Sequence, residues 1–381
     1  MALLAILIIG AVLVARRDGG SSFALSLLIG LSLGIIFERG RFCFYCIFKD
    51  SIKQKNSAPL LPIYVAIAVG SIGYSIVLGQ FLPDARSGYL PPGAHIPPLS
   101  GPLLLAAFIF GCGMALSGSC ISGHLYRIGV GNIKSIPALA GVILGFVLAF
   151  KSWNFLYLSL ISEAPTIWLP QYLGYAGSLA VTLTLVGYLI YRAQRSSQSS
   201  ATIRGGSFAE QFHRLIYRPW GPVLTGSLVG IIGTIAYLRI EPLGVTRQLG
   251  TTARMIGDGY NLIPKDLKGL DVMSGCIAIL DQVFAKNGWL ILGITFGSFL
   301  SAYAGLRFKL TKITLRQTIA SFLGGILLGW GSMIALGCTI GVLLSGTQAF
   351  ALSGWAFFLF VYVGVRTGRR LGLHKAAYLG V

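Results

Sequence analysis

Two glycine-rich segments of this sequence, residues 111–123 and 329–341, echo each other. Aligned without a gap, they share three glycines and one cysteine at identical spacing. Each copy stands at the end of a long apolar run, where a glycine costs a helix roughly 1 kcal/mol relative to alanine. We therefore expect two duplicated helices, each broken at a point where the break itself is useful.

The apolar composition places these helices in a membrane. Of the 381 residues, 55% are hydrophobic and only 11% are charged, and the mean hydropathy is +0.77. A soluble globule of this length needs more polar surface. The chain is therefore predicted to be an all-α polytopic membrane protein that contacts membrane lipids. Its net charge of +19 lies mainly in short loops, which is typical of topology signals and not of nucleic-acid binding.

Hydropathy divides the chain into candidate spans, since a bilayer core of about 30 Å requires roughly 20 apolar residues per helix. The predicted spans are residues 2–15, 22–38, 59–82, 101–118, 134–150, 170–191, 219–239, 288–306, 317–335 and 352–366. Four apolar pieces are too short to cross and are predicted to be re-entrant half-helices: residues 42–49, 121–131, 271–282 and 339–349. The first span lacks a basic leader and a cleavage site, so it is interpreted as a retained anchor.

The positions of lysine and arginine orient the spans. Most of the 30 basic residues fall in five segments that this scheme places in the cytoplasm, together with both termini. The five segments are residues 39–58, 119–134, 192–218, 307–316 and the tail from 366. Among the exceptions, which the scheme leaves outside, are Arg16, Arg17 and the basic residues of the long loop 240–287.

An odd number of connecting spans predicts that the second half of the chain is upside down. Residues 22–150 and 219–366 each hold four spans and two short pieces, and a second echo pairs residues 30–36 with 226–232. The expected architecture is an inverted repeat of two four-span halves whose short re-entrant helices meet at mid-membrane. The resulting division is an anchor at 1–21, a first repeat at 22–150, a connector span and cytoplasmic linker at 151–218, a second repeat at 219–366 and a cytoplasmic tail at 367–381.

The helix breaks carry the main candidate residues. Irregular backbone at membrane depth is tolerated only where it is buried in protein or lines a cavity. Half-helices that begin at the breaks would direct free N–H groups toward a shared axis, which favours an anion. Cys120 and Cys338 would reach that axis from opposite sides, and Gly118 and Gly337 stand beside them in the breaks. These four residues are therefore predicted to bind the substrate.

Four other positions complete the candidate pathway or compete with it. Cys43 and Arg41 begin another short piece, where Arg41 would hold an anion at the inner mouth or would simply mark a cytoplasmic helix end. His124 would couple protons to movement, or it is a satisfied structural histidine. Arg247 would form an outer anion funnel with loop amides, or it lies in a solvated loop.

Cysteine at these positions suits a soft anion. A neutral thiol is a weak, polarisable donor that can touch sulfur at low desolvation cost. The competing interpretation is that a cysteine is only a small apolar filler, and we favour it for Cys46, Cys112 and Cys276. The pattern Cys43-x-x-Cys46 lacks a thioredoxin-like setting. No catalytic constellation, metal site or cofactor site is predicted.

The three motifs around Cys43, Cys120 and Cys338 resemble those of the YeeE/YedE family of bacterial thiosulfate transporters. The resemblance covers about residues 22–366. It implies nine spans plus four short helices in an hourglass shape, with thiosulfate relayed by those three neutral thiols. It also implies a cytoplasmic TusA-like sulfurtransferase as partner. The extra span 2–15 departs from the family pattern, and some members of the family are tied to selenium metabolism.

The resulting hypothesis is a multi-pass transporter, not an enzyme, that imports thiosulfate across the bacterial inner membrane. Two alternatives remain. One is transport of another sulfur or selenium anion, such as sulfite, sulfide or a selenium compound. The other is a membrane sulfur-transfer or redox protein that holds a cysteine persulfide.

Overall fold

The computed structural model describes residues 20–196, 218–270, 273 and 285–378, and within these ranges the chain is helical without extended strands. The first half contains α2 (Gly20–Arg39), α3 (Phe44–Gln54), η1 (Ala58–Leu60), α4 (Leu61–Phe81), α5 (Gly101–Ser117), α6 (Ile121–Gly129), α7 (Ser135–Leu156), the π-helix η2 (Tyr157–Ile161) and α8 (Leu169–Arg195). The second half contains α10 (Pro222–Arg239), α11 (Thr246–Gly259), α12 (Lys286–Ala304), α13 (Leu315–Ile334), the π-helix η3 (Thr339–Gly346), α14 (Leu352–Arg370) and α15 (Leu373–Tyr378).

Seven helical segments of the described chain are long and apolar enough to cross a membrane. They are Gly20–Gln54, Ala58–Phe81, Gly101–Gly129, Ser135–Ile161, Leu169–Arg195, Pro222–Arg239 and Leu315–Ile334. The predicted spans 288–306 and 352–366 are also helices, α12 and α14, of 19 residues each, but they are less apolar than the other seven. The predicted span 2–15 lies outside the described residues.

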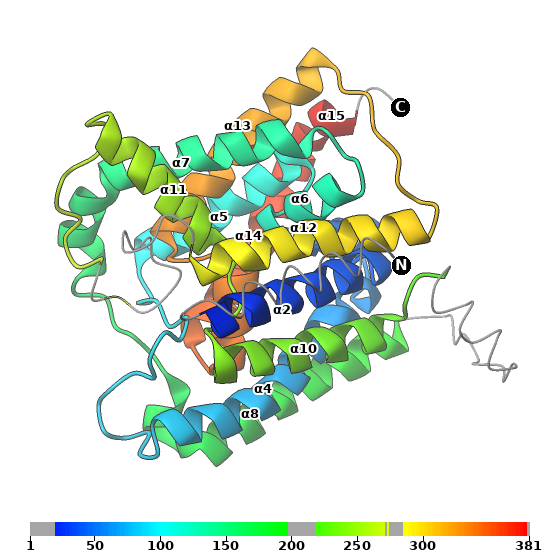
Figure 1. The fold of residues 1–381 in the computed structure, drawn as a ribbon. Helices are drawn as coiled ribbons and strands as arrows, with labels where there is room; N and C mark the ends of the chain where they lie inside the picture. Colours follow the sequence, from blue (N-terminus) through cyan, green and yellow to red (C-terminus); the bar gives the residue numbers. More distant parts are fainter. Residues whose placement is uncertain (1–19, 197–217, 271–272, 274–284, 379–381) are drawn as a thin grey trace, which may run out of the picture.

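The two echoes found in the sequence are sites of close helix packing. Helix α2 runs parallel to α12, and α10 packs along α4 (Figure 1). A Cβ on Gly30 would lie 2.3 Å from the carbonyl oxygen of Leu290, and a Cβ on Gly226 would lie 2.4 Å from that of Pro62. The glycines of the second echo therefore let one helix of each half approach a helix of the other half.

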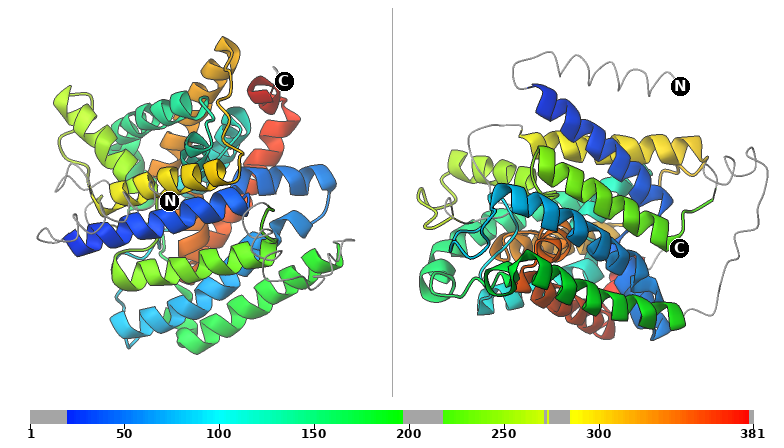
Figure 2. Two further views of the ribbon diagram at one scale, coloured as in Figure 1. Left: turned by 45° about the vertical axis from the view of Figure 1, so that its right-hand side comes forward. Right: turned by 90° about the horizontal axis from the view of Figure 1, so that it is seen from below.

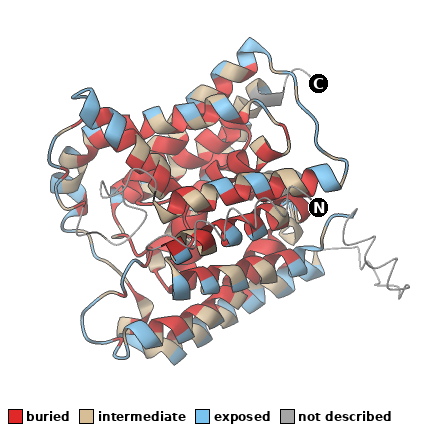
Figure 3. Cartoon of the chain, viewed as in Figure 1, coloured by how far each residue is buried: buried red, intermediate tan, exposed pale blue. Residues whose placement is uncertain are grey.

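Helices α5 and α13 pack against each other in the centre and each has one further close neighbour. Helix α14 packs on α5, and α7 packs on α13. The duplicated glycines make these contacts, since a Cβ on Gly111 would meet the carbonyl oxygen of Val361 at 2.4 Å and one on Gly329 would meet that of Val142 at 2.1 Å. The buried residues concentrate on these central helices, whereas the outward sides of the outer helices are exposed (Figure 3).

Helix α8 lies on the flank of the bundle. It packs on α4, and the two helices stay side by side in both views of Figure 2. Only 17% of its apolar segment is buried, and its backbone is interrupted at Gly174, where φ is 67°. Because so little of α8 is covered by protein, most of its surface is available to lipid.

The ends of these helices define two faces. Trp220 donates its backbone N–H to Arg39, and Lys309 donates its own to Val130, so segments far apart in sequence meet on one side, toward the right of Figure 1. We call this side the basic face; it comprises residues 39–60, 118–134, 192–196, 218–221, 305–316 and 366–378. The described parts of the five segments predicted to be cytoplasmic all lie on it.

Three of the four predicted half-helices are present as α3, α6 and η3, and the fourth, residues 271–282, falls outside the described residues apart from Met273. The loop predicted at 240–287 contains a helix instead. Residues 246–259 form α11, which packs on α7. Its glycines and threonines have low intrinsic helix propensity, so tertiary contacts stabilise it.

Candidate functional site

Cys43 and Cys120 each occupy the N-cap position of a short helix, and the two helices meet at these residues. Cys43 precedes α3 and Cys120 precedes α6. Both side chains are fully buried, and the Cys43 thiol contacts that of Cys120 and lies 3.5 Å from the hydroxyl of Ser119. The Cys120 sulfur accepts the backbone N–H of Gly123 at 3.3 Å. We call this arrangement the two-thiol site.

Gly123 keeps space between these side chains. A Cβ at this position would lie 2.9 Å from the Cys43 sulfur, 3.2 Å from the Cys120 sulfur and 2.2 Å from the Ser119 hydroxyl. Real Cβ atoms do not approach a neighbour so closely, so any larger residue would push the thiols apart. The absence of a side chain at Gly123 therefore allows the two sulfur atoms to lie close together.

The two-thiol site lies in an electropositive environment. The N-termini of α3 and α6 both direct backbone N–H groups toward it, and each end carries roughly half a positive charge. Arg127, in the last turn of α6, adds a full charge nearby. Its Nη1 donates to the carbonyl of Gly118 at 2.8 Å and its Nη2 donates to the thiol of Cys46 at 3.0 Å. This combination favours an anion over a neutral molecule.

A cavity of about 430 Å³ on the basic face reaches Arg127. We call it the vestibule; its lining includes Arg41, Tyr126, Arg127, Lys134, Arg307 and Lys309. Arg41 adopts a left-handed backbone conformation with φ of 49°, which turns the chain from α2 into α3. Arg41 thus lines the vestibule at the turn between two helices, and its predicted contact with an anion stays a prediction.

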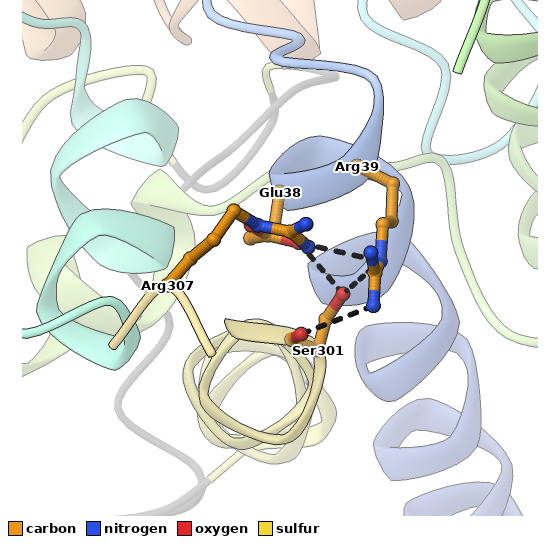
Figure 4. A network of polar contacts seen from close by, with 4 residues as sticks. All are labelled: Glu38, Arg39, Ser301 and Arg307. Atoms are coloured by element: carbon orange, nitrogen blue, oxygen red, sulfur yellow. Dashed lines mark hydrogen bonds and ion pairs between the residues drawn. The ribbon is translucent and has the colours of Figure 1, made fainter. Parts of the chain in front are cut away.

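One wall of the vestibule is held by a buried ionic network between α2 and α12 (Figure 4). Glu38 accepts from Arg307 Nε at 2.7 Å and from the Ser301 hydroxyl at 2.7 Å. Ser301 in turn accepts from Arg39 Nε at 2.8 Å. Glu38 and Arg39 are both nearly inaccessible. The network neutralises Glu38, so the remaining charge of the vestibule is positive.

Cys338 forms a separate site nearer the other face. It caps η3, is fully buried, and contacts the side chain of Thr246 at the start of α11. Among the described residues, the buried hydroxyl of Thr339 has no hydrogen-bond partner, and that of Thr246 has only the Cys338 thiol beside it. Such groups usually find a partner, and an anion between two helix N-termini would supply one. We call this the single-thiol site.

Unusual backbone conformations produce both breaks. Gly118 ends α5 with φ of 83°, and its carbonyl is the one that Arg127 binds. At the end of α13, Leu336 has φ of 56° and Gly337 has φ of 156°. At these residues the chain turns away from the ends of α5 and α13. The turns bring Cys120 and Cys338 to the two sites, each at the start of the next helix. Gly118 and Gly337 thus lie at the breaks, and their predicted contact with the substrate stays a prediction.

Two predicted site residues have partners that change their interpretation. His124 is buried, and its Nδ1 lies 3.2 Å from the hydroxyl of Ser135, while Nε2 has no hydrogen-bond partner among the described residues. Arg247 forms an ion pair with Glu241, and its backbone belongs to α11. The expected funnel of free loop amides around Arg247 is therefore absent from this helical segment.

The sequence reasoning missed several contact residues. Ser119 and Gly123 lie inside the first echo but were not selected, and Arg127 follows Gly123 by one helical turn. Cys46, for which the sequence favours the role of an apolar filler, contacts Cys43 and Arg127. The signal available was spacing, since Gly123 and Arg127 lie four residues apart and therefore on one side of a helix.

Comparison with known proteins gives a consistent picture. The family model described as Sulphur transport matches residues 39–367. The chain is similar to the thiosulfate transporter TsuA of Escherichia coli, with 28% identity over 345 residues, or 90% of this chain and 92% of the relative. It is also similar to the TsuA of Spirochaeta thermophila, with 26% identity over 352 residues, or 89% and 95% of the two chains. A probable transporter YedE of Escherichia coli is 26% identical over 163 residues, 42% of this chain and 38% of the relative.

Proposed function

Since the chain belongs to the sulphur transport (YeeE/YedE) family, we propose that it imports thiosulfate across the bacterial inner membrane. One observation carries the proposal. Two buried sites each combine a cysteine thiol with the N-termini of two short helices, and they lie toward opposite faces of one helical bundle. The relatives named as thiosulfate transporters align over nine tenths of the chain.

Thiosulfate suits both sites chemically. It is a dianion with a soft terminal sulfur, so backbone N–H groups and Arg127 offset its charge while a neutral thiol touches its sulfur. At the thiols themselves the protein offers mainly the partial positive charges of helix N-termini, and the thiols are neutral. Binding at each site is therefore favourable yet weak enough to be left, which passage through a membrane requires.

The order of the sites follows from the faces. The basic face is cytoplasmic by the positive-inside rule. An anion entering from the other side would meet Cys338 first, pass to Cys120 and Cys43, and leave past Arg127 and Arg41 in the vestibule. There a cytoplasmic TusA-like sulfurtransferase would receive it. His124 follows Cys120 on α6, and its Nε2, which has no partner among the described residues, would serve the two-thiol site. Arg247 would serve the single-thiol site from the first turn of α11.

An inverted repeat accounts for this arrangement. Exchanging the two halves turns the α2–α12 contact into α10–α4 and the α7–α13 contact into α14–α5, and both members of each pair occur. The same exchange pairs α3 with α11 and α6 with η3. The two-thiol site and the single-thiol site would then be equivalent places in the two halves, with Thr246 standing where the first half has Cys43.

Uptake of ³⁵S-thiosulfate by vesicles reconstituted with the purified protein tests the function. We expect uptake that saturates, that sulfate does not inhibit, and that fails when Cys120 or Cys338 is replaced by alanine. Competition by sulfite, sulfide or a selenium anion would instead identify one of these as the cargo. Wild-type uptake by both alanine variants would reject the thiol relay.

Persulfide chemistry is the competing possibility and is separable by mass. A cysteine thiolate attacking the outer sulfur of thiosulfate would gain that sulfur as a persulfide and release sulfite, with no change in the total number of electrons. Intact-protein mass spectrometry after exposure to thiosulfate should show the unmodified mass. A stable gain of one sulfur atom on Cys43, Cys46 or Cys120 would support sulfur transfer in place of transport.

A further inference from the structure

A second and larger cavity opens on the basic face, away from the two-thiol site. Its volume is about 960 Å³, and it lies where the cytoplasmic-side ends of α3, α4, α8 and α14 come together. None of the residues lining it lines the vestibule. We call it the basic bowl. The proposed transport pathway does not use it, so its composition requires a separate explanation.

The rim of the basic bowl is cationic. Of the described residues that line it, none carries a negative charge and six carry a positive charge: Lys53, Lys55, Arg192, Arg366, Arg369 and Arg370. Like charges gathered in one concave site repel one another, and the low-dielectric walls strengthen the field. Such a site attracts an anion that can contact several cations at once.

The floor of the basic bowl is apolar and aromatic. Tyr64, Phe358 and Tyr362 line it, and the rings of Phe358 and Tyr362 each pack edge-on against Phe48 at centroid distances of 5.5 Å and 5.6 Å. A small free anion would touch the rim and leave this floor in contact with water. A ligand with a charged head and an apolar body would cover both.

The walls of the bowl come from helices that face lipid. Arg192 and Ser196, at the C-terminal end of α8, form one wall, and most of the apolar segment of α8 is not covered by protein. Residues of α14 form the opposite wall. Helix α8 packs on α4, and α14 packs on α5. A molecule in the bowl would therefore join two helices that are attached to different neighbours.

We propose that the basic bowl binds the headgroup of an anionic phospholipid of the cytoplasmic leaflet. The phosphodiester contacts the arginines of α8 and α14, and the glycerol and upper acyl chains cover the aromatic floor. Basic pockets between helix ends on the cytoplasmic side are a recurrent form of lipid recognition. Binding would link α8 to α14 and so stabilise the flank of the bundle.

Lipid binding can be measured by native mass spectrometry of the purified full-length protein with phosphatidylglycerol or phosphatidylcholine added in a neutral detergent. We expect the wild type to retain phosphatidylglycerol in preference. The double variant Arg366→Gln/Arg369→Gln should bind it roughly 25-fold more weakly, since each cation near an anionic headgroup contributes roughly a fivefold effect. The variant Lys53→Gln/Lys55→Gln, on a different helix, should show a loss of the same order.

The matched control is Lys312→Gln/Arg316→Gln, which removes two cations from the same face outside the bowl. This control should keep wild-type affinity, and phosphatidylglycerol should raise the melting temperature of the wild type and the control more than that of either bowl variant. Equal loss in the control, or equal retention of phosphatidylcholine, would overturn the proposal.

Complete competition by inorganic phosphate would indicate a free-anion site. Binding of an acidic soluble protein that depends on the bowl, without preference for phosphatidylglycerol, would identify a protein-docking surface and also reject the lipid.

Discussion

Arg127 donates a hydrogen bond from Nη2 to the thiol of Cys46 across 3.0 Å, which ties the end of α6 to the first turn of α3. The two residues are 81 positions apart in the chain. Through this contact the arginine stands between the two-thiol site and the vestibule. Its other terminal nitrogen, Nη1, donates to the carbonyl of Gly118, so the guanidinium is fixed by two neutral acceptors and keeps its full positive charge beside the two-thiol site.

Replacing Arg127 with lysine should raise the KM for thiosulfate more than it lowers the maximal rate. Lysine keeps the charge, but a single ammonium group cannot reproduce the two divergent hydrogen bonds of the guanidinium. Glutamine removes the charge as well and should reduce uptake at low substrate at least tenfold. Initial rates of uptake over a range of thiosulfate concentrations test this, and unchanged KM values in both variants would contradict it.

Replacing Cys120 or Cys338 with alanine should abolish thiosulfate uptake while leaving expression and folding intact. Serine should restore little, since a hydroxyl is a harder and more strongly hydrated donor than a thiol. The matched control is Cys112→Ala, because the Cys112 thiol donates to the carbonyl of Gly364 between α5 and α14 and lies in neither site. Uptake by the control at less than half the wild-type rate would indicate a general packing effect.

The substitution Gly123→Ala should reduce uptake at least tenfold. The added methyl group would occupy the position between Ser119 and the two sulfur atoms, so the thiols would have to separate. Gly79→Ala provides the control, because no atom lies within 4 Å of the methyl group that it adds to α4. The control should transport normally and gain up to about 1 kcal/mol in stability from its better helix propensity. Normal uptake by Gly123→Ala would show that thiol spacing is unimportant.

The substitution Glu38→Gln should destabilise the protein by about 2 kcal/mol, because it leaves Ser301 and the partly exposed Arg307 without their charged acceptor in a buried network. Thermal unfolding in detergent measures this. The control is Asp50→Asn, which breaks the partly exposed Lys49–Asp50 pair and should change stability by less than about 0.5 kcal/mol. Equal melting temperatures for the two variants would refute the structural role of Glu38.

The stability of the fold should fall as the pH is lowered from 7 to 4, partly through His95 in the loop between α4 and α5. Burial, assisted by the charge of Arg247, lowers the pKa of His95 to about 4. The ordinary pKa of histidine is about 6.5, so between pH 6.5 and pH 4 the unfolded chain binds a proton at this side chain and the folded chain does not. The free energy of unfolding therefore falls by about 3 kcal/mol across that window. In His95→Gln this part of the pH dependence should disappear. An unchanged pH profile of the melting temperature would contradict the assignment.

Much of the secondary structure could be predicted from local sequence. The long apolar runs indicated α2, α4, α5, α7, α8, α10 and α13, and their lysines and arginines indicated which ends share a face. Helix α11 was missed because residues 246–259 are polar and rich in glycine and threonine, so only contact with α7 makes them helical. The sequence consequently predicts a loop at Arg247, whereas this residue lies on a helix and pairs with Glu241.

Sequence by itself determined that this chain crosses a membrane and that each of its two central helices ends in a glycine-rich break followed by a cysteine, because hydropathy and residue spacing are local properties of the chain. Only the tertiary structure decided that Cys43 meets Cys120 from 77 residues away, that Gly123 keeps their sulfur atoms together, and that Arg127 reaches Cys46. These relations depend on where the packed helices place the N-termini of α3 and α6, and no local pattern records the distance between two such ends.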